Sequence, residues 1–248
     1  LYAYWKSSTI RLMKPLFGVL VFLCLLSLAS PVGATVLTFD NCGVTGGASI
    51  SPCDGGALNT AYGNRVSGSA GNLVYGDSGE GFTPNITIAY NPASNLFTWG
   101  TGYGNLTNVL WVSQSVGVID IVFTADPGFQ AVLYGADVAG FGQSYTIGSI
   151  TIVNEAAQTL FSAGNVSASG TTATSLNFGA VSSGAGGFLR LRMDVTNLPA
   201  TDFSRESVGL DNIRFGQTDL GTTVPEPGTT AMVFAGLGLL AVWRRKAS

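Results

Sequence analysis

Apolar and polar residues alternate through much of the chain, most cleanly in residues 188–195. Leu189, Leu191, Met193 and Val195 fall on one side of this segment and its charged residues on the other, as in a β-strand with one buried face. No long stretch of the central part shows the 3.6-residue apolar period of an amphipathic helix. The same criteria, with Gly, Asn and Ser between apolar runs, predict strands at 36–39, 73–75, 86–90, 96–99, 109–112, 116–124, 131–138, 145–153, 159–162, 175–178 and 208–215.

About a dozen short strands separated by turns predict an all-β fold, a β-sandwich of the jelly-roll type. Asp126-Pro127-Gly128 predicts a tight turn between two of these strands. Residues 54–71 are rich in Gly, Ser and Asn, so they predict a long surface loop.

The last predicted strand contains a change of phase. Val208 and Leu210 share one face by parity, whereas Ile213 and Phe215 share the other. One extra residue near Asp211 would keep all four apolar side chains inward, so the pattern predicts a β-bulge there.

Residues 222–248 have a different, three-part pattern. An uncharged apolar run covers about 229–243; Val224, Pro225, Glu226 and Pro227 precede it, and Arg244, Arg245 and Lys246 follow it. A transmembrane helix of this run would be roughly 22 Å long, short for roughly 30 Å of bilayer hydrocarbon. The basic cluster would remain cytoplasmic, which leaves the rest of the chain outside. A plain membrane anchor behind a proline-rich linker is the alternative.

These three parts, in this order, resemble the PEP-CTERM sorting signal of Gram-negative, exopolysaccharide-producing bacteria. The resemblance implies that exosortase, a membrane protease-transferase, recognises and removes the tail. It therefore implies an inner-membrane-anchored precursor that later reaches the cell surface or the extracellular matrix.

The other end of the chain has the pattern of a secretory signal peptide. Met13 and Lys14 precede an uncharged apolar stretch at 16–28, and small residues lead to a predicted signal-peptidase cut after Ala34. Residues 1–34 are therefore expected to be upstream sequence and signal peptide, with translation starting at Met13. A retained N-terminal membrane helix is the alternative.

Residues 35–221 remain as one exported domain, long enough to bury a core. This ectodomain has five Arg, no Lys and thirteen Asp or Glu, a formal charge of −8. Nucleic-acid binding depends on Lys and Arg that neutralise phosphates, so this composition argues against a nucleic-acid partner.

Cys42 and Cys53 are the ectodomain's two cysteines, and export would place them in an oxidising compartment. They predict a disulfide, which would contribute ~3 kcal/mol by closing a short loop. The chain has no histidine, so a zinc site would have too few soft ligands.

Residues 125–129, 133–140 and 208–215 resemble, in outline, jelly-roll domains that precede PEP-CTERM signals and are similar to carbohydrate-binding modules. In such modules the first and last strands often hold a structural calcium, and the resemblance implies that role for Asp40 and Asp211. Calcium takes six to eight oxygen ligands, so two carboxylates and backbone carbonyls would be an incomplete set. The alternative is that Asp211 hydrogen-bonds the backbone at the bulge and Asp40 caps a turn.

Catalysis has little basis in this sequence, and we expect no enzyme. Without histidine, Ser-His-Asp and Cys-His mechanisms are excluded in their usual form. A carboxylate pair could still cleave glycosidic bonds, and the candidates are Asp120, Asp126, Asp137, Glu155 and Asp194.

Trp99, Tyr103 and Trp111 lie close in sequence among glycines that predict turns, so they could present flat rings to a sugar. The alternative is that the tryptophans are core residues of strands. The sequence thus predicts a non-catalytic surface or matrix protein associated with exopolysaccharide or biofilm, with a carbohydrate-binding module as the alternative. Its processing partners would be signal peptidase and exosortase.

Overall fold

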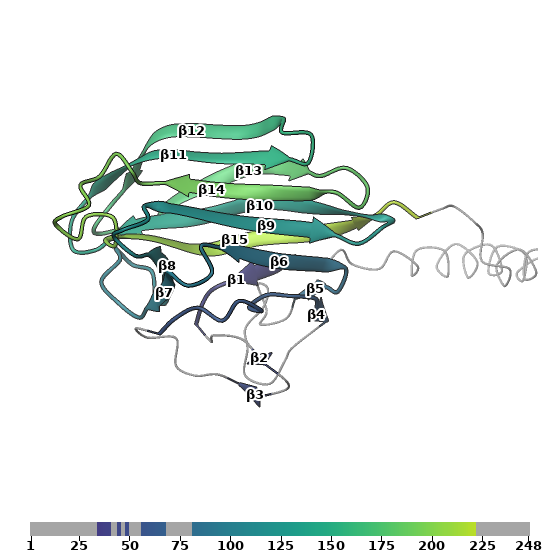
Figure 1. The fold of residues 1–248 in the computed structure, drawn as a ribbon, viewed down its shortest axis with the longest axis horizontal. Helices are drawn as coiled ribbons and strands as arrows, with labels where there is room; N and C mark the ends of the chain where they lie inside the picture. Colours follow the sequence, from purple (N-terminus) through teal and green to yellow (C-terminus); the bar gives the residue numbers. More distant parts are fainter. Residues whose placement is uncertain (1–33, 41–43, 46–47, 50–55, 68–80, 222–248) are drawn as a thin grey trace, which may run out of the picture. The chain divides into compact units, whose positions relative to one another are not determined.

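The computed structural model describes residues 34–40, 44–45, 48–49, 56–67 and 81–221. Within these ranges the regular structure is all β, in two main antiparallel sheets (Figure 1), which confirms the predicted fold class. The described residues contain no helix long and apolar enough to cross a membrane. Outside these ranges lie residues 1–33 of the predicted signal peptide, Cys42, Cys53, the apolar run at 229–243 and the predicted strand at 73–75, so the disulfide stays a prediction.

Fifteen strands are present in the described residues. They are β1 (Thr35–Leu37), β2 (Val44–Thr45), β3 (Ala48–Ser49), β4 (Val66–Ser67), β5 (Phe82–Thr83), β6 (Ile86–Asn91), β7 (Leu96–Trp99), β8 (Val109–Val112), β9 (Val118–Ala125), β10 (Phe129–Gly140), β11 (Tyr145–Asn154), β12 (Thr159–Ala168), β13 (Thr174–Ser182), β14 (Phe188–Asp194) and β15 (Val208–Asp219).

One main sheet has the order β13-β10-β15-β8-β7, with β1 also paired to β15. The other has the order β12-β11-β14-β9-β6, and β2-β3 and β4-β5 form two small hairpins. Consecutive strands from β8 to β15 alternate between the main sheets except at the β11-β12 hairpin. The chain therefore crosses repeatedly between two layers, with β12 and β6 at opposite edges of one of them (Figure 1).

The core lies between these layers and follows the two-residue period of the strands. In β14, the predicted inward residues Leu189, Leu191 and Met193 are all buried, while the arginines between them reach solvent. Phe123 of β9 and Phe215 of β15 contact across the core, with ring centroids 5.1 Å apart. Each aromatic ring of this kind buries a large apolar area, which is the main stabilising contribution of such a sandwich.

Two predicted strands, 96–99 and 109–112, match β7 and β8 at both ends. The strands predicted at 159–162 and 175–178 are much longer in the structure, as β12 and β13. Both lie at the outer edge of a sheet and consist largely of small polar residues with exposed side chains. They have little apolar alternation, so the pattern identified only part of each.

The predicted surface loop at 54–71 is wrong for its described part, residues 56–67. Leu58, Tyr62 and Val66 are buried in the core, and β4 begins at Val66. The Tyr62 ring stacks on Phe39 with centroids 5.1 Å apart, and its hydroxyl accepts a hydrogen bond from the Phe39 N–H (2.9 Å). Gly and Asn allow the turns of this segment, while its three apolar side chains hold it against the sheets.

The predicted bulge in the last strand is confirmed. Between the pairs Gly135↔Arg214 and Asp137↔Asp211, β15 contains one residue more than β10, and Asn212 takes a left-handed φ of 48°. Asn tolerates this conformation better than most residues. Val208, Leu210, Ile213 and Phe215 consequently all reach the core.

Candidate functional site

The bulge in β15 brings two buried carboxylates opposite each other. Asp137 of β10 pairs with Asp211 of β15, and the two residues are 8% and 3% exposed. Like charges directly opposite in a sheet are unfavourable, and burial adds the cost of desolvation. Such a pair therefore needs polar partners, and the bulge supplies them.

Asn212 serves both acids. Its backbone N–H donates to Asp211 Oδ1 (2.6 Å), and its side-chain Nδ2 donates to Asp137 Oδ2 (3.0 Å). The other oxygen, Asp137 Oδ1, is buried without a hydrogen-bond donor and lies 3.7 Å from Arg214 Nη2. Burial raises the pKa of Asp211 to about 8; the Asn212 N–H opposes that shift, and the charges of Asp40 and Asp137 add to it.

The predicted calcium ligands Asp40 and Asp211 are close enough to interact electrostatically. Asp40 Oδ1 accepts hydrogen bonds from Asn108 Nδ2 (2.8 Å) and Thr107 Oγ1 (3.4 Å). In the part of the chain that the structure describes, no group of three or more His, Cys, Asp or Glu residues is arranged to hold a metal ion. Asp211 instead bonds the bulge backbone, which is the alternative role considered from the sequence, and the calcium site stays a prediction.

The three aromatic residues singled out from the sequence have different environments. Trp99 is 41% exposed and meets Phe141, itself 43% exposed, edge to face at 6.5 Å. Tyr103 is buried, and its hydroxyl donates to the Glu206 carbonyl. Burial also raises the pKa of Tyr103, which keeps the hydroxyl protonated. The Tyr103 ring is thus part of a small second core, whereas the Trp99–Phe141 pair is exposed to solvent.

Trp111 of β8 lies on the outer face of the sheet that contains β7 and β8. Its ring stacks on Phe97 of β7, with centroids 4.9 Å apart. Its ring is half-buried, and its Nε1 is buried without a hydrogen-bond partner. Neither Trp99 nor Trp111 belongs to the main core, so the alternative that the two tryptophans are core residues is not what the structure shows. A ligand-binding role for these residues stays a prediction.

Each of the five carboxylates considered for catalysis accepts at least one hydrogen bond from another residue. Asp120 accepts two hydrogen bonds from Arg192, both 2.8 Å, and this contact raises the pKa of the guanidinium. Glu155 accepts hydrogen bonds from the backbone N–H groups of Gly184 (2.9 Å) and Phe188 (3.3 Å). Asp194 accepts from the N–H and hydroxyl of Thr196 (2.8 and 2.6 Å). Asp137 lies at the bulge.

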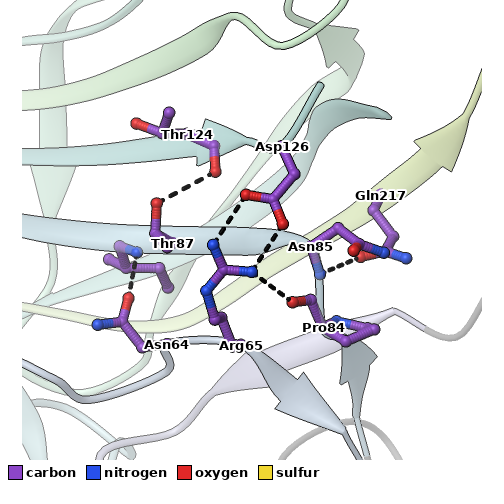
Figure 2. Close-up of polar contacts among 9 residues, drawn as sticks. Asn64, Arg65, Pro84, Asn85, Thr87, Thr124, Asp126 and Gln217 are labelled. Atoms are coloured by element: carbon purple, nitrogen blue, oxygen red, sulfur yellow. Dashed lines mark hydrogen bonds and ion pairs between the residues drawn. The ribbon is translucent and has the colours of Figure 1, made fainter. Parts of the chain in front are cut away.

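Asp126, the fifth, closes a clamp between distant segments (Figure 2). Arg65 donates to both of its oxygens (2.6 and 2.8 Å) and also to the Pro84 carbonyl (3.2 Å). The hydrogen bond to Arg65 lowers the pKa of Asp126. Beside this pair, the Asn85 N–H donates to Gln217 Oε1 (2.9 Å). The clamp ties residues 56–67 to the turn between β9 and β10.

The sequence missed two features of these surfaces. Phe141 follows β10, and the sequence does not connect it with Trp99, because the two residues are far apart in the chain. The Asp137–Asp211 pairing depends on the register of β10 against β15, which the bulge shifts. The change of apolar parity in residues 208–215 was the one sequence signal that pointed to this place.

Comparison with protein families identifies the C-terminal segment. Residues 223–246 match the PEP-CTERM protein-sorting motif. The PEP-CTERM motif contains Val224, Pro225, Glu226, Pro227 and the Arg244-Arg245-Lys246 cluster, so the predicted sorting signal is confirmed. It implies an exported protein that exosortase processes, whose C-terminus associates with the membrane and which is sorted to the cell envelope or surface.

The ectodomain resembles solved structures at low sequence identity. No curated protein matches the chain. Matching solved structures include a Podospora anserina GH26-CBM35 β-(1,4)-mannanase, with 13% identity and a TM-score of 0.31 over 57% of this chain and 29% of that one. They also include the enzymatically active domain of bacteriophage CBA120 tailspike protein 4, with 17% identity and a TM-score of 0.30 over 62% and 21%. The chain thus spans less than a third of either structure.

Proposed function

We propose that this chain is a non-catalytic surface or extracellular-matrix protein of a Gram-negative bacterium, associated with exopolysaccharide or biofilm. The observation that carries the proposal is the PEP-CTERM motif at residues 223–246. In this proposal signal peptidase cuts after Ala34, and exosortase removes the tail near Val224 to Pro227. The product is an acidic, Lys-free β-sandwich, and the alternation of β8 to β15 between two layers supports a jelly-roll arrangement.

The contacts of the five candidate carboxylates support a non-catalytic role. A glycosidase needs two carboxyl groups facing a shared substrate, as acid and as base or nucleophile. Asp120 and Asp126 are each paired with an arginine, and Glu155 is bonded to backbone amides. Asp194 is bonded to Thr196, and Asp137 accepts a hydrogen bond from Asn212 at the bulge.

Removal of residues 224–248 tests the sorting assignment. In a host with exosortase, the full chain should reach the cell surface or medium, whereas the shortened chain should not follow that route. A matched Pro225→Ala/Pro227→Ala variant keeps the apolar run and the basic cluster, so it should remain with the inner membrane in unprocessed form. Unchanged surface delivery of the shortened chain would contradict the assignment.

A second candidate function, carbohydrate binding, is favoured by the exposed pair of Trp99 and Phe141. Flat aromatic rings that remain in solvent are suited to stack on sugar faces through apolar contact. Polysaccharide pull-down with the full chain should show retention that Trp99→Ala abolishes. Phe203, also strongly exposed, offers a matched Phe203→Ala control that should leave retention unchanged. Retention that is the same in both variants would exclude the Trp99 surface.

A further inference from the structure

The outer edge of β7 is covered by the chain's own N-terminal part. The Leu58 N–H donates to the Leu96 carbonyl (2.9 Å), and the Thr98 N–H donates to the Gly56 carbonyl (3.0 Å). These bonds extend the sheet beyond β7, its edge strand. They satisfy backbone groups that an edge strand would otherwise present to another chain.

The outer edge of β6, in the other sheet, is covered in the same way. The Arg65 N–H donates to the Ile86 carbonyl (2.9 Å), and Asn64 Oδ1 accepts from the Ile88 N–H. Figure 2 shows Asn64 and Arg65 lying along this strand. Both sheet edges on this side of the sandwich are therefore closed by residues 56–65.

The opposite edges have no such cover in the described residues. Within the described part of the chain, β12 pairs only with β11, and β13 only with β10. The two strands are consecutive, and Phe161 of β12 packs against Phe178 of β13 with ring centroids 4.9 Å apart, which closes the core at this side. Among the residues that the structure describes, no strand pairs with the outer side of β12.

Natural proteins protect such edges with charged side chains, prolines or bulges. Residues 156–189, which include all of β12 and β13, contain no Asp, Glu, Lys, Arg or Pro. The register of β13 shifts between Leu133 and Gly135 of its partner strand, near the left-handed Gly179 and Ala180, so β13 is interrupted by a bulge. β12 also has one extra residue, Leu160, between the pairs Ile152↔Phe161 and Val153↔Thr159. From Phe161 to Ala168 it keeps one register with β11, although Asn165 has a left-handed φ of 52°.

We infer that the β12 edge is an interaction surface for a second copy of this chain, which pairs β12 to β12 in antiparallel orientation across a twofold axis. The distribution of charge along the chain favours a second copy as the partner. The ectodomain carries a formal charge of −8, so two copies repel one another over most approaches. At the uncharged β12 edge, two copies can approach closely without placing like charges opposite each other. Across a twofold axis, each copy contributes the same strand, β12, to the interface.

Charged substitutions on β12 test this pairing in the full-length chain, purified in detergent. Ser162 and Ser167 have exposed side chains on β12, and Ala89 and Asn91 are exposed on the covered strand β6. The wild-type chain and an Ala89→Lys/Asn91→Lys control should sediment as dimers. Ser162→Lys/Ser167→Lys places four lysines across the twofold pair, so it should raise the dimer Kd about tenfold or more.

The sorting tail is present in all three chains, so association through the membrane segment would not distinguish them. A wild-type chain that stays monomeric at about 100 µM overturns the inference, because specific interfaces of standard size hold well below that concentration. A lysine variant that dimerises as tightly as the wild type also overturns it. Circular dichroism establishes whether the lysine variant is folded.

Disulfide cross-linking gives an independent test if the lysine variant does not fold. A Ser162→Cys chain should form a covalent dimer under mild oxidation, well above the yield of the wild type with its native cysteines. The matched Ala89→Cys chain should not exceed that background, since residues 64 and 65 cover the β6 edge. Equal yields from the two variants would exclude the β12 edge.

Discussion

Raising the pH from 5 to 8 is expected to destabilise this protein, and Asp211 is the reason. In the unfolded chain its carboxyl loses the proton near the ordinary pKa of 3.8, whereas burial at the bulge holds the folded-state pKa at about 8. Between those two values the folded state binds one proton more than the unfolded state. The free energy of unfolding therefore falls as pH rises, from full stabilisation below about pH 4 to its loss above about pH 8.

The size of this effect follows from proton linkage. One extra bound proton gives a slope of about 1.4 kcal/mol per pH unit, so the interval from pH 5 to 8 corresponds to up to about 4 kcal/mol. Relaxation at the bulge would reduce that value, and we expect a measured loss of at least about 2 kcal/mol. This is a large fraction of the roughly 5–15 kcal/mol that stabilises an ordinary domain.

Urea unfolding at intervals across this pH range, in EDTA, measures the slope. The chain contains no histidine, so few other side chains titrate in the same interval. Asp211→Asn keeps the shape of the side chain but cannot ionise, and it should remove the slope and be the more stable chain at pH 8. Asp219→Asn changes an exposed acid of the same strand and should keep the wild-type slope. A flat wild-type profile, or a slope that persists in Asp211→Asn, would refute the reasoning.

Three further predictions concern stability. Phe215→Ala removes a fully buried ring that contacts Phe123, and should lower the free energy of unfolding by about 3–5 kcal/mol in chemical denaturation. Arg65→Ala breaks an exposed ion pair, so the Tm measured by calorimetry should fall by no more than about 3 °C. A much larger fall would contradict this estimate and mean that the Arg65–Asp126 pair also stabilises the packing of residues 56–67. Added calcium should raise the Tm relative to EDTA through Asp40 and Asp211, and a Tm that is equal in both conditions would count against the predicted site.

The fold class could be predicted because strands with one buried face carry their period in the sequence. β14 alternates arginine with apolar residues, and β7 and β8 are bounded by turn-forming residues, so these strands were identified closely. β12 has mostly exposed small side chains, so its second half gave no pattern. The segment around Tyr62 has the composition of a loop, and its contact with Phe39 comes from tertiary packing that composition does not reveal.

The candidate sites divide in the same way. The sorting motif is a linear signal read without folding, so the sequence contains all of it. The parity change around Asp211 predicted the bulge, but the partner Asp137 depends on strand register, which one chain's periodicity leaves open. Trp99 and Phe141 meet only because the last residue of β7 and the residue after β10 are neighbours in space.

The position of β15 has a consequence for how the exported chain matures. This last strand lies inside its sheet, between β10 on one side and β8 and β1 on the other. β1 pairs with it directly, Thr35 against Phe215, although the two residues stand at opposite ends of the ectodomain. Pairing over so long a separation is slow, and the sheet stays open until residues 208–219 have emerged. A chain that ends before Val208 would lack both a central strand and the sorting motif at 223–246. Such a chain could neither close its core nor be sorted by exosortase.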